Sequence, residues 1–179
     1  FQTLAFDKST LAHTPLPALY NCNRKDRMQV FFERREHDIA IYVLDAQGEA
    51  RPGWPKDFDG RWMISSPTLA DMDQDGTLEI LCSDLFRGSG RLHVLKPDGT
   101  EMNEYWPLAL PHIPAVTPSV GDVNDDGFPD IVITDTRDVF ALNRLAELLE
   151  GWPPALPNTK FSYQSPLILH RGGEQEPSI

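Results

Sequence analysis

The sequence DMDQDGTLE at residues 71–79 is similar to the sequence DVNDDGFPD at residues 122–130, which lies 51 residues further along the chain. In both stretches an oxygen-bearing side chain stands at positions 1, 3, 5 and 9, and glycine stands at position 6. Calcium prefers oxygen ligands, and glycine permits the sharp turn that brings alternate side chains to one point. The candidate ligands are the side chains of Asp71, Asp73, Asp75, Glu79, Asp122, Asn124, Asp126 and Asp130, with the backbone carbonyls of Thr77 and Phe128.

The gathering of carboxylates in each loop favours a bound cation. Two carboxylates ~4 Å apart repel by roughly 4 kcal/mol at an effective dielectric constant of about 20. Calcium relieves such repulsion because it accepts about six to eight oxygens. The sequence therefore predicts two structural calcium ions. An EF-hand is rejected, because position 12, where an EF-hand carries a bidentate glutamate, holds Cys82 in one loop and Ile133 in the other.

The two loops are parts of a longer sequence repeat of about fifty residues. Trp-Pro pairs begin at Trp54, Trp106 and Trp152, and weaker copies of the loop precede and follow the two strong ones. The predicted units cover residues 17–66, 67–117 and 118–165 of a single incomplete domain, 1–179, with the end of a unit at 1–16 and the start of one at 166–179. We expect no metal in the two outer loops. In the first outer loop the ligand positions hold Asn21, Asn23, Lys25 and Gln29. In the last outer loop they hold His170, Gly172 and Glu174.

Each unit is predicted to contain four short strands, which in the second unit lie at residues 68–70, 78–83, 91–95 and near 104–108, with a tight turn at 96–99. The stretches 39–44 and 130–133 are apolar on both faces, which is typical of strands covered on both sides. A four-stranded sheet of this kind, repeated about every fifty residues, indicates an all-β fold, a β-propeller, with about three and a half blades in this chain. The recurring tryptophans are then expected to pack one blade against the next.

The composition argues against several classes of partner. The formal net charge of −11 at pH 7 disfavours nucleic acid and anionic membrane surfaces. No apolar run approaches the roughly 18 residues that span a bilayer. Two cysteines, Cys22 and Cys82, are too few for a disulfide framework, so we expect buried or free thiols. The chain begins at Phe1 rather than methionine, which we interpret as a fragment or a processed product.

The two loops, the Val-Leu-Asp stretch at residues 43–45 and the Gly-Trp-Pro stretch at 53–55 resemble the FG-GAP/VCBS repeats of integrin α-subunits and many secreted microbial proteins. The resemblance covers roughly residues 17–179 and is strongest in the middle two units. It implies a propeller of typically about seven blades, calcium between the first two strands of a blade, and an extracellular, periplasmic or cell-surface setting. Because the chain holds too few units to close such a ring, the rest of the propeller or another protein subunit is the expected partner.

These features predict a non-catalytic module for binding or scaffolding. The sequence has no Gly-x-Ser-x-Gly nucleophile elbow, and its five histidines show no zinc-binding spacing. The candidate variable loops are residues 33–38, 84–90 and 135–138. Two alternatives remain. One is a glycan-binding domain in which Trp62 and Tyr105 stack on sugars, and the other is an accessory subunit or domain of a larger enzyme or membrane-associated complex.

Overall fold

The computed structural model describes residues 29–34, 39–45, 47–63, 65–114, 116–154 and 165–168. Its regular elements within these ranges are strands, and none of the described residues forms a helix long and apolar enough to cross a membrane. The strands are β1 (Gln29–Arg34), β2 (Ile39–Leu44), β3 (Lys56–Asp57), β4 (Thr68–Ala70), β5 (Glu79–Phe86), β6 (Ser89–Leu95), β7 (Leu108–Leu110), β8 (Ser119–Gly121), β9 (Asp130–Thr134) and β10 (Val139–Leu142). The described part of the chain is therefore all-β, as predicted.

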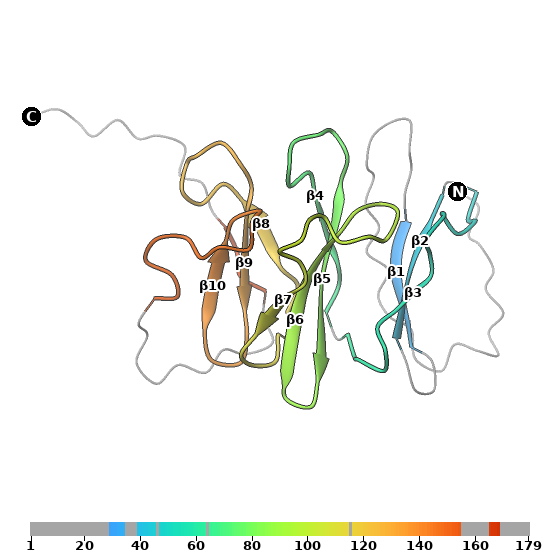
Figure 1. Cartoon of the computed structure of the whole chain (residues 1–179), viewed down its shortest axis with the longest axis horizontal. Coiled ribbons are helices and arrows are strands. Elements are labelled where there is room, and N and C mark those ends of the chain that lie inside the picture. The colour runs from blue at the N-terminus through green and yellow to red at the C-terminus, as the bar shows by residue number, and fades with distance from the viewer. Residues whose placement is uncertain are drawn as a thin grey trace, which may run out of the picture.

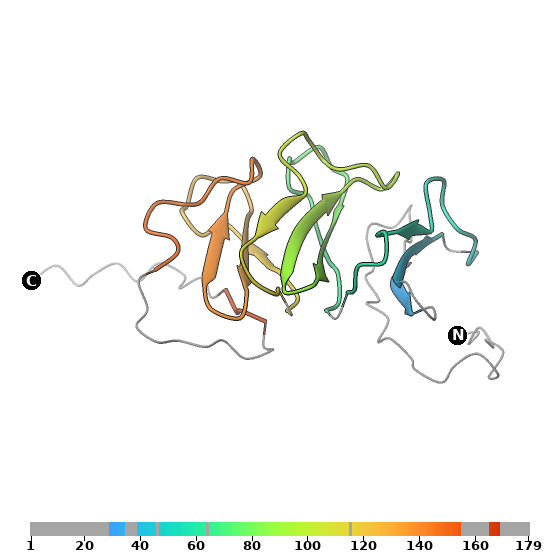
Figure 2. The ribbon, with the colours of Figure 1, turned by 60° about the horizontal axis from the view of Figure 1, so that its bottom comes forward.

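The strands form three separate antiparallel sheets. The first sheet contains β1, β2 and β3, the middle sheet contains β4 to β7, and the third sheet contains β8, β9 and β10. Figures 1 and 2 show these sheets side by side in chain order along the longest axis of the molecule. Sheets that follow one another in the sequence are thus neighbours in space.

The central strands of the middle and third sheets bury side chains on both faces. In β5, Ile80 and Cys82 belong to an apolar cluster shared with the first sheet, whereas Leu81 belongs to a cluster shared with the third sheet. In β9, Ile131 packs in the cluster shared with the middle sheet, and Val132 packs in a separate cluster. Side chains alternate between the faces of a strand, so an unbroken apolar run is buried on both sides. This confirms the prediction for residues 130–133.

Equivalent hydrogen bonds join successive sheets. The indole N–H of Trp54 donates to the carbonyl of Pro97 (2.7 Å), and the indole N–H of Trp106 donates to the carbonyl of Arg144 (3.2 Å). Each bond runs from a tryptophan just before the last strand of one sheet to a turn in the next sheet. Both indoles are buried. The prediction that tryptophans pack one sheet against the next is therefore confirmed for these two residues.

A second bond recurs near the start of the middle and third sheets. The hydroxyl of Thr68 in β4 donates to the carbonyl of Pro118 (2.5 Å), and the hydroxyl of Ser119 in β8 donates to the carbonyl of Pro166. The two donors are 51 residues apart and the two acceptors 48, which are the spacings seen in the sequence. The segment that contains Pro166 thus contacts the third sheet as the segment before β8 contacts the middle sheet.

Most predicted strands of the middle sheet are confirmed, but two predictions are wrong. The strand predicted near residues 104–108 begins only at the end of that range, because the carbonyl of Asn103 accepts the N–H of Trp106 (3.3 Å) in a turn. The variable loop predicted at residues 84–90 is mostly strand, since β5 and β6 extend to a two-residue turn at 87–88. The reason for this extension is the ionic network described below.

Candidate metal loops and a buried ionic network

The two acidic loops, residues 71–79 and 122–130, occupy equivalent places in the middle and third sheets. The first loop joins β4 to β5, and the second joins β8 to β9. Both lie at the same edge of the molecule, at the top of Figure 1. Each loop therefore stands between the first two strands of its sheet.

The two loops share one conformation. The N–H of Gly76 donates to Oδ2 of Asp71 (3.0 Å), and the N–H of Gly127 donates to Oδ2 of Asp122 (2.8 Å). The two glycines have φ values of +88° and +89°, which glycine adopts without steric cost. Further equivalent bonds join Met72 N–H to Glu79 and Val123 N–H to Asp130 (both 2.9 Å), and Thr77 N–H to Asp75 and Phe128 N–H to Asp126 (2.6 and 2.8 Å). These bonds orient the carboxylates that are predicted to bind metal.

The first loop brings ligand atoms together. One oxygen from each of Asp71, Asp73 and Glu79 lies within 4.8 Å of the others. Burial, together with the charges of the nearby aspartates, raises the pKa of Glu79 to about 7. Oδ1 of Asp71 is buried and has no hydrogen-bond partner among the described residues. An unpartnered buried carboxylate oxygen is costly, and an all-oxygen donor set suits calcium, so these residues fit a calcium ion.

The second loop shares this burial but is less closely gathered. Asp130 is 1% exposed, and its Oδ1 is buried with no hydrogen-bond partner among the described residues. Burial raises the pKa of Asp130 above its ordinary value. The amide of Asn124 donates to Asp126 (3.0 Å). Although every residue of this loop is described, its three predicted carboxylate ligands do not all place oxygens within 4.8 Å of one another. The donor set suits calcium, with less preorganisation than in the first loop.

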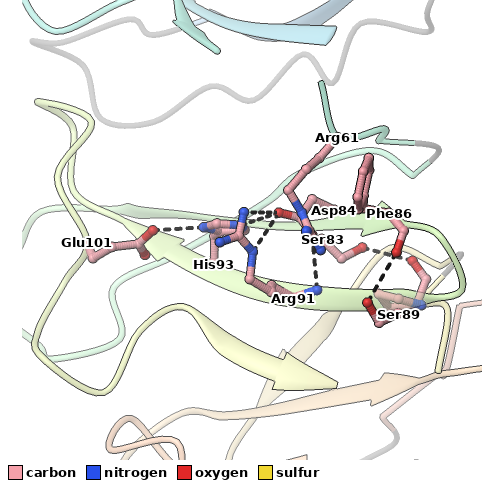
Figure 3. Close-up of polar contacts among 9 residues, drawn as sticks. Arg61, Ser83, Asp84, Phe86, Ser89, Arg91, His93 and Glu101 are labelled. Carbon is pink, nitrogen blue, oxygen red and sulfur yellow. Dashed lines mark hydrogen bonds and ion pairs between the residues drawn. The ribbon is translucent and has the colours of Figure 1, made fainter. Parts of the chain in front are cut away.

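A buried ionic network surrounds Asp84 near the other end of β5, as Figure 3 shows. The Asp84 side chain is 0% exposed and forms ion pairs with Arg61 (2.7 Å) and Arg91 (2.9 Å). Its Oδ2 also lies 2.9 Å from Nε2 of His93, and Nδ1 of His93 lies 2.8 Å from Oε1 of Glu101. The network thus ties the segment that follows the first sheet to the two central strands of the middle sheet.

Charges within the network shift two pKa values. Burial acts to raise the pKa of Asp84, but contacts with His93, Arg61 and Arg91 outweigh burial and hold this pKa below its ordinary value. Burial acts to lower the pKa of His93, but hydrogen bonds to Asp84 and Glu101 outweigh it and raise this pKa. His93 is therefore placed to carry a positive charge, with both ring nitrogens donating hydrogen bonds to carboxylates.

Sequence reasoning missed this network. It assigns Asp84 to a variable loop and finds no role for the histidines. A signal was present, because Arg61 and Asp84 are followed 51 residues later by His112 and Asp135. These two residues also pair, with Nδ1 of His112 3.1 Å from Oδ2 of Asp135. Comparison of the units beyond the acidic loops would have found both pairs.

Other predicted residues have mixed outcomes. Cys82 is buried and free, as predicted. Trp62 and Tyr105, the predicted sugar-stacking residues, are 43% and 50% exposed, and the glycan hypothesis stays a prediction. Several predictions lie outside the described residues: Cys22, residues 35–38 of one variable loop, Asn21, Asn23, Lys25, His170, Gly172 and Glu174.

Comparisons of the chain with protein-family models, with curated proteins and with solved structures found no significant match. The functional argument therefore depends on the contacts, burial and charges of the chain's own residues.

Proposed function

We propose that the chain is part of a calcium-stabilised β-propeller that resembles the FG-GAP/VCBS repeats, and that it serves as a non-catalytic module for binding or scaffolding. The observation that carries this proposal is the pair of buried, unpartnered carboxylate oxygens of Asp71 and Asp130, in two loops of the same conformation. The corresponding setting is an extracellular, periplasmic or cell-surface protein.

The energetic argument for calcium starts from Glu79. This carboxylate is 2% exposed and lies near three aspartates. Its pKa is raised to about 7 because burial and these neighbouring charges make its charged form unfavourable. A divalent cation among the carboxylates replaces repulsion by attraction. At ~1 mM calcium and a Kd of ~0.1 mM, each site adds about 1.4 kcal/mol to the free energy of unfolding. Calcium then stabilises the fold and takes part in no reaction.

The contacts between sheets support the blade interpretation. Each sheet shares an apolar cluster with the next, and the bonds from Trp54 and Trp106 to the following sheet are equivalent. Propeller blades are four-stranded sheets that pack in succession in this way. Of the three described sheets the middle one has four strands, and the other two have three each within the described residues. On the outer side of the third sheet, Val132 packs in a cluster with Ile168, near the start of the predicted fourth unit. Further blades, or another subunit, would continue from this face.

Native mass spectrometry in calcium and in EDTA tests the proposal. We expect two calcium ions per chain in the wild type, and one after Asp71→Ala or Asp122→Ala. The matched control is Glu104→Gln, at an exposed acidic residue outside the loops, which should retain both ions. A variant that carries both Asp71→Ala and Asp122→Ala should bind no calcium. The proposal would be contradicted if this variant retained two ions, or if the wild type retained none at millimolar calcium.

The same measurement on the chain from its natural source separates two forms of the proposed function. Additional polypeptides in the particle would make the chain an accessory part of a larger complex. A particle that contains only this chain and calcium would favour a self-standing binding module.

A further inference from the structure

The ion pair of the middle sheet has a counterpart in the third sheet that is built from different residues. His112 follows Arg61 by 51 residues, and Asp135 follows Asp84 by the same number. Nδ1 of His112 lies 3.1 Å from Asp135, and Nε of Arg61 lies 2.7 Å from Asp84. Both aspartate side chains are 0% exposed. The two pairs therefore occupy equivalent positions, each connecting a carboxylate to the segment that leaves the preceding sheet.

The residue across the hairpin differs in charge between the two sheets. Arg91 is the cross-strand partner of Asp84 and donates to its Oδ2 through Nε and a terminal nitrogen (3.0 and 2.9 Å). In the third sheet the corresponding place is held by Asp138, whose carbonyl accepts the N–H of Asp135 (3.0 Å). A guanidinium that neutralises a buried carboxylate is thus replaced by a second carboxylate.

Asp135 consequently has fewer cations around it than Asp84 has. Two arginines and His93 contact Asp84. Within the described residues, the imidazole of His112 contacts Asp135, and the carboxylate of Asp138 lies close to both. A buried carboxylate requires compensating charge or full hydrogen bonding. Asp135 accepts hydrogen bonds, but among the described residues no arginine or lysine forms an ion pair with it, so a bound cation would take the role that Arg61 and Arg91 have at Asp84.

The three side chains are arranged as metal ligands. His112, Asp135 and Asp138 each place one ligand atom within 4.8 Å of the others. Tetrahedral coordination at ~2.1 Å from the ion sets ligand atoms about 3.4 Å apart, so small side-chain rotations would suffice. Oδ1 of Asp135 accepts the N–H groups of Arg137 and Asp138 (2.7 and 2.8 Å), which holds this carboxylate in place. The His112 side chain is 30% exposed, so an ion can enter from solvent.

We propose that His112, Asp135 and Asp138 bind a divalent transition-metal ion of the zinc class. An imidazole nitrogen is a good ligand for zinc, whereas calcium and magnesium prefer oxygen alone. Three protein ligands leave at least one coordination position for water or for a group from a partner. The site is separate from the acidic loop of the same sheet, because Asp130 begins β9 and Asp135 follows its end. It connects the middle sheet, through the segment after β7, to the third sheet.

Zinc titration of the full chain, with calcium in excess to saturate the acidic loops, tests this site. We expect one zinc ion per chain by isothermal titration calorimetry. Asp138→Asn should weaken zinc binding by at least about 10-fold. His112→Arg should abolish it and still fold, because an arginine already pairs with the equivalent aspartate, Asp84, in the middle sheet. Glu104→Gln, at an exposed acidic residue outside the acidic loops and the proposed zinc site, is the control and should bind zinc as the wild type does.

Cobalt gives a second readout that reports on the ligands directly. The visible absorption of cobalt bound to the wild type should be lost in His112→Arg and retained in Glu104→Gln. Equal zinc uptake by wild type, Asp138→Asn and His112→Arg would overturn the proposal, because the ion would then bind elsewhere. Absence of uptake by the wild type would also overturn it, and would leave a His112–Asp135 hydrogen bond that only joins the two sheets.

Discussion

Nε of Arg61 lies 2.7 Å from the carboxylate of Asp84, so a residue that follows the first sheet is paired with the central hairpin of the middle sheet. Arg91 and His93 reach the same carboxylate from β6 (Figure 3). Three cationic groups thus converge on one buried anion. Loss of that anion would leave them to repel one another in a partly desolvated place.

Asp84→Ala should therefore be strongly destabilising. Removal of one member of a buried ionic network costs about 3–5 kcal/mol, because the remaining charges are left uncompensated. Urea denaturation should show a lower midpoint with an unchanged m value. Asp98→Ala is the control, since Asp98 is an exposed turn residue that bonds to Thr100, and its loss should cost about 1 kcal/mol. Similar midpoints for the two variants would show that the network contributes little.

His93 should make the stability of the chain depend on pH. Its pKa is raised above the ordinary value of 6.5 in the folded chain by its bonds to Asp84 and Glu101. The folded state therefore holds this proton more tightly than the unfolded state does. The resulting stabilisation is fully present below about pH 6.5 and is lost as the pH rises through the raised folded-state pKa.

Urea unfolding of the wild type between about pH 6 and pH 9 measures this effect. The free energy of unfolding should fall over that range, and the fall should be smaller in His93→Gln. NMR titration of the His93 ring gives the pKa itself. Parallel pH profiles for wild type and variant would mean that His93 does not hold its proton more tightly in the folded chain.

The acidic loops and the strand that follows each were predictable because their signals are local. Glycine at position 6 and carboxylates at alternate positions describe one turn, and Gly76 and Gly127 have the positive φ that this turn needs. The buried strand β9 was predictable from its apolar run for the same reason, since both of its faces are specified by consecutive residues.

The ionic network was not predictable from local pattern, because its members come from separate segments. The sequence predicted Asp84 in a variable loop and Arg91 at the start of a strand, and neither position by itself indicates an ion pair. Only the register of β5 against β6, which places Arg91 opposite Asp84, makes them partners. Their mutual neutralisation lets β5 continue through Asp84 to Phe86, where the sequence predicted a loop. The end of a strand was therefore decided by tertiary contacts.

The first acidic loop should bind calcium more tightly than the second. It offers four carboxylates, three of which already gather within 4.8 Å, whereas the second offers three carboxylates and the amide of Asn124. More ligand charge and better preorganisation both favour affinity. Calorimetry on Asp122→Ala, which retains the first loop, should give a lower Kd than on Asp71→Ala, which retains the second. The reverse order would show that carboxylate repulsion outweighs the added charge.

Gly53 and Gly151 form a matched pair at equivalent Gly-Trp-Pro stretches, with φ values of +89° and +82°. A Cβ on Gly53 would lie 1.9 Å from the carbonyl oxygen of Asp98, in a turn of the middle sheet. A Cβ on Gly151 meets no heavy atom of the described chain within 4 Å. Gly151→Ala should cost about 1–2 kcal/mol, through its positive φ alone.

Gly53→Ala should cost about 1–3 kcal/mol more than Gly151→Ala, because the backbone at Asp98 must also move. Urea denaturation of both variants measures the difference. In an assembled propeller, a further blade would bring its own turn against Gly151, as Asp98 lies against Gly53. The two costs should therefore become similar when the rest of the propeller is present. Equal costs in the isolated chain would mean that this face of the third sheet is already covered in solution.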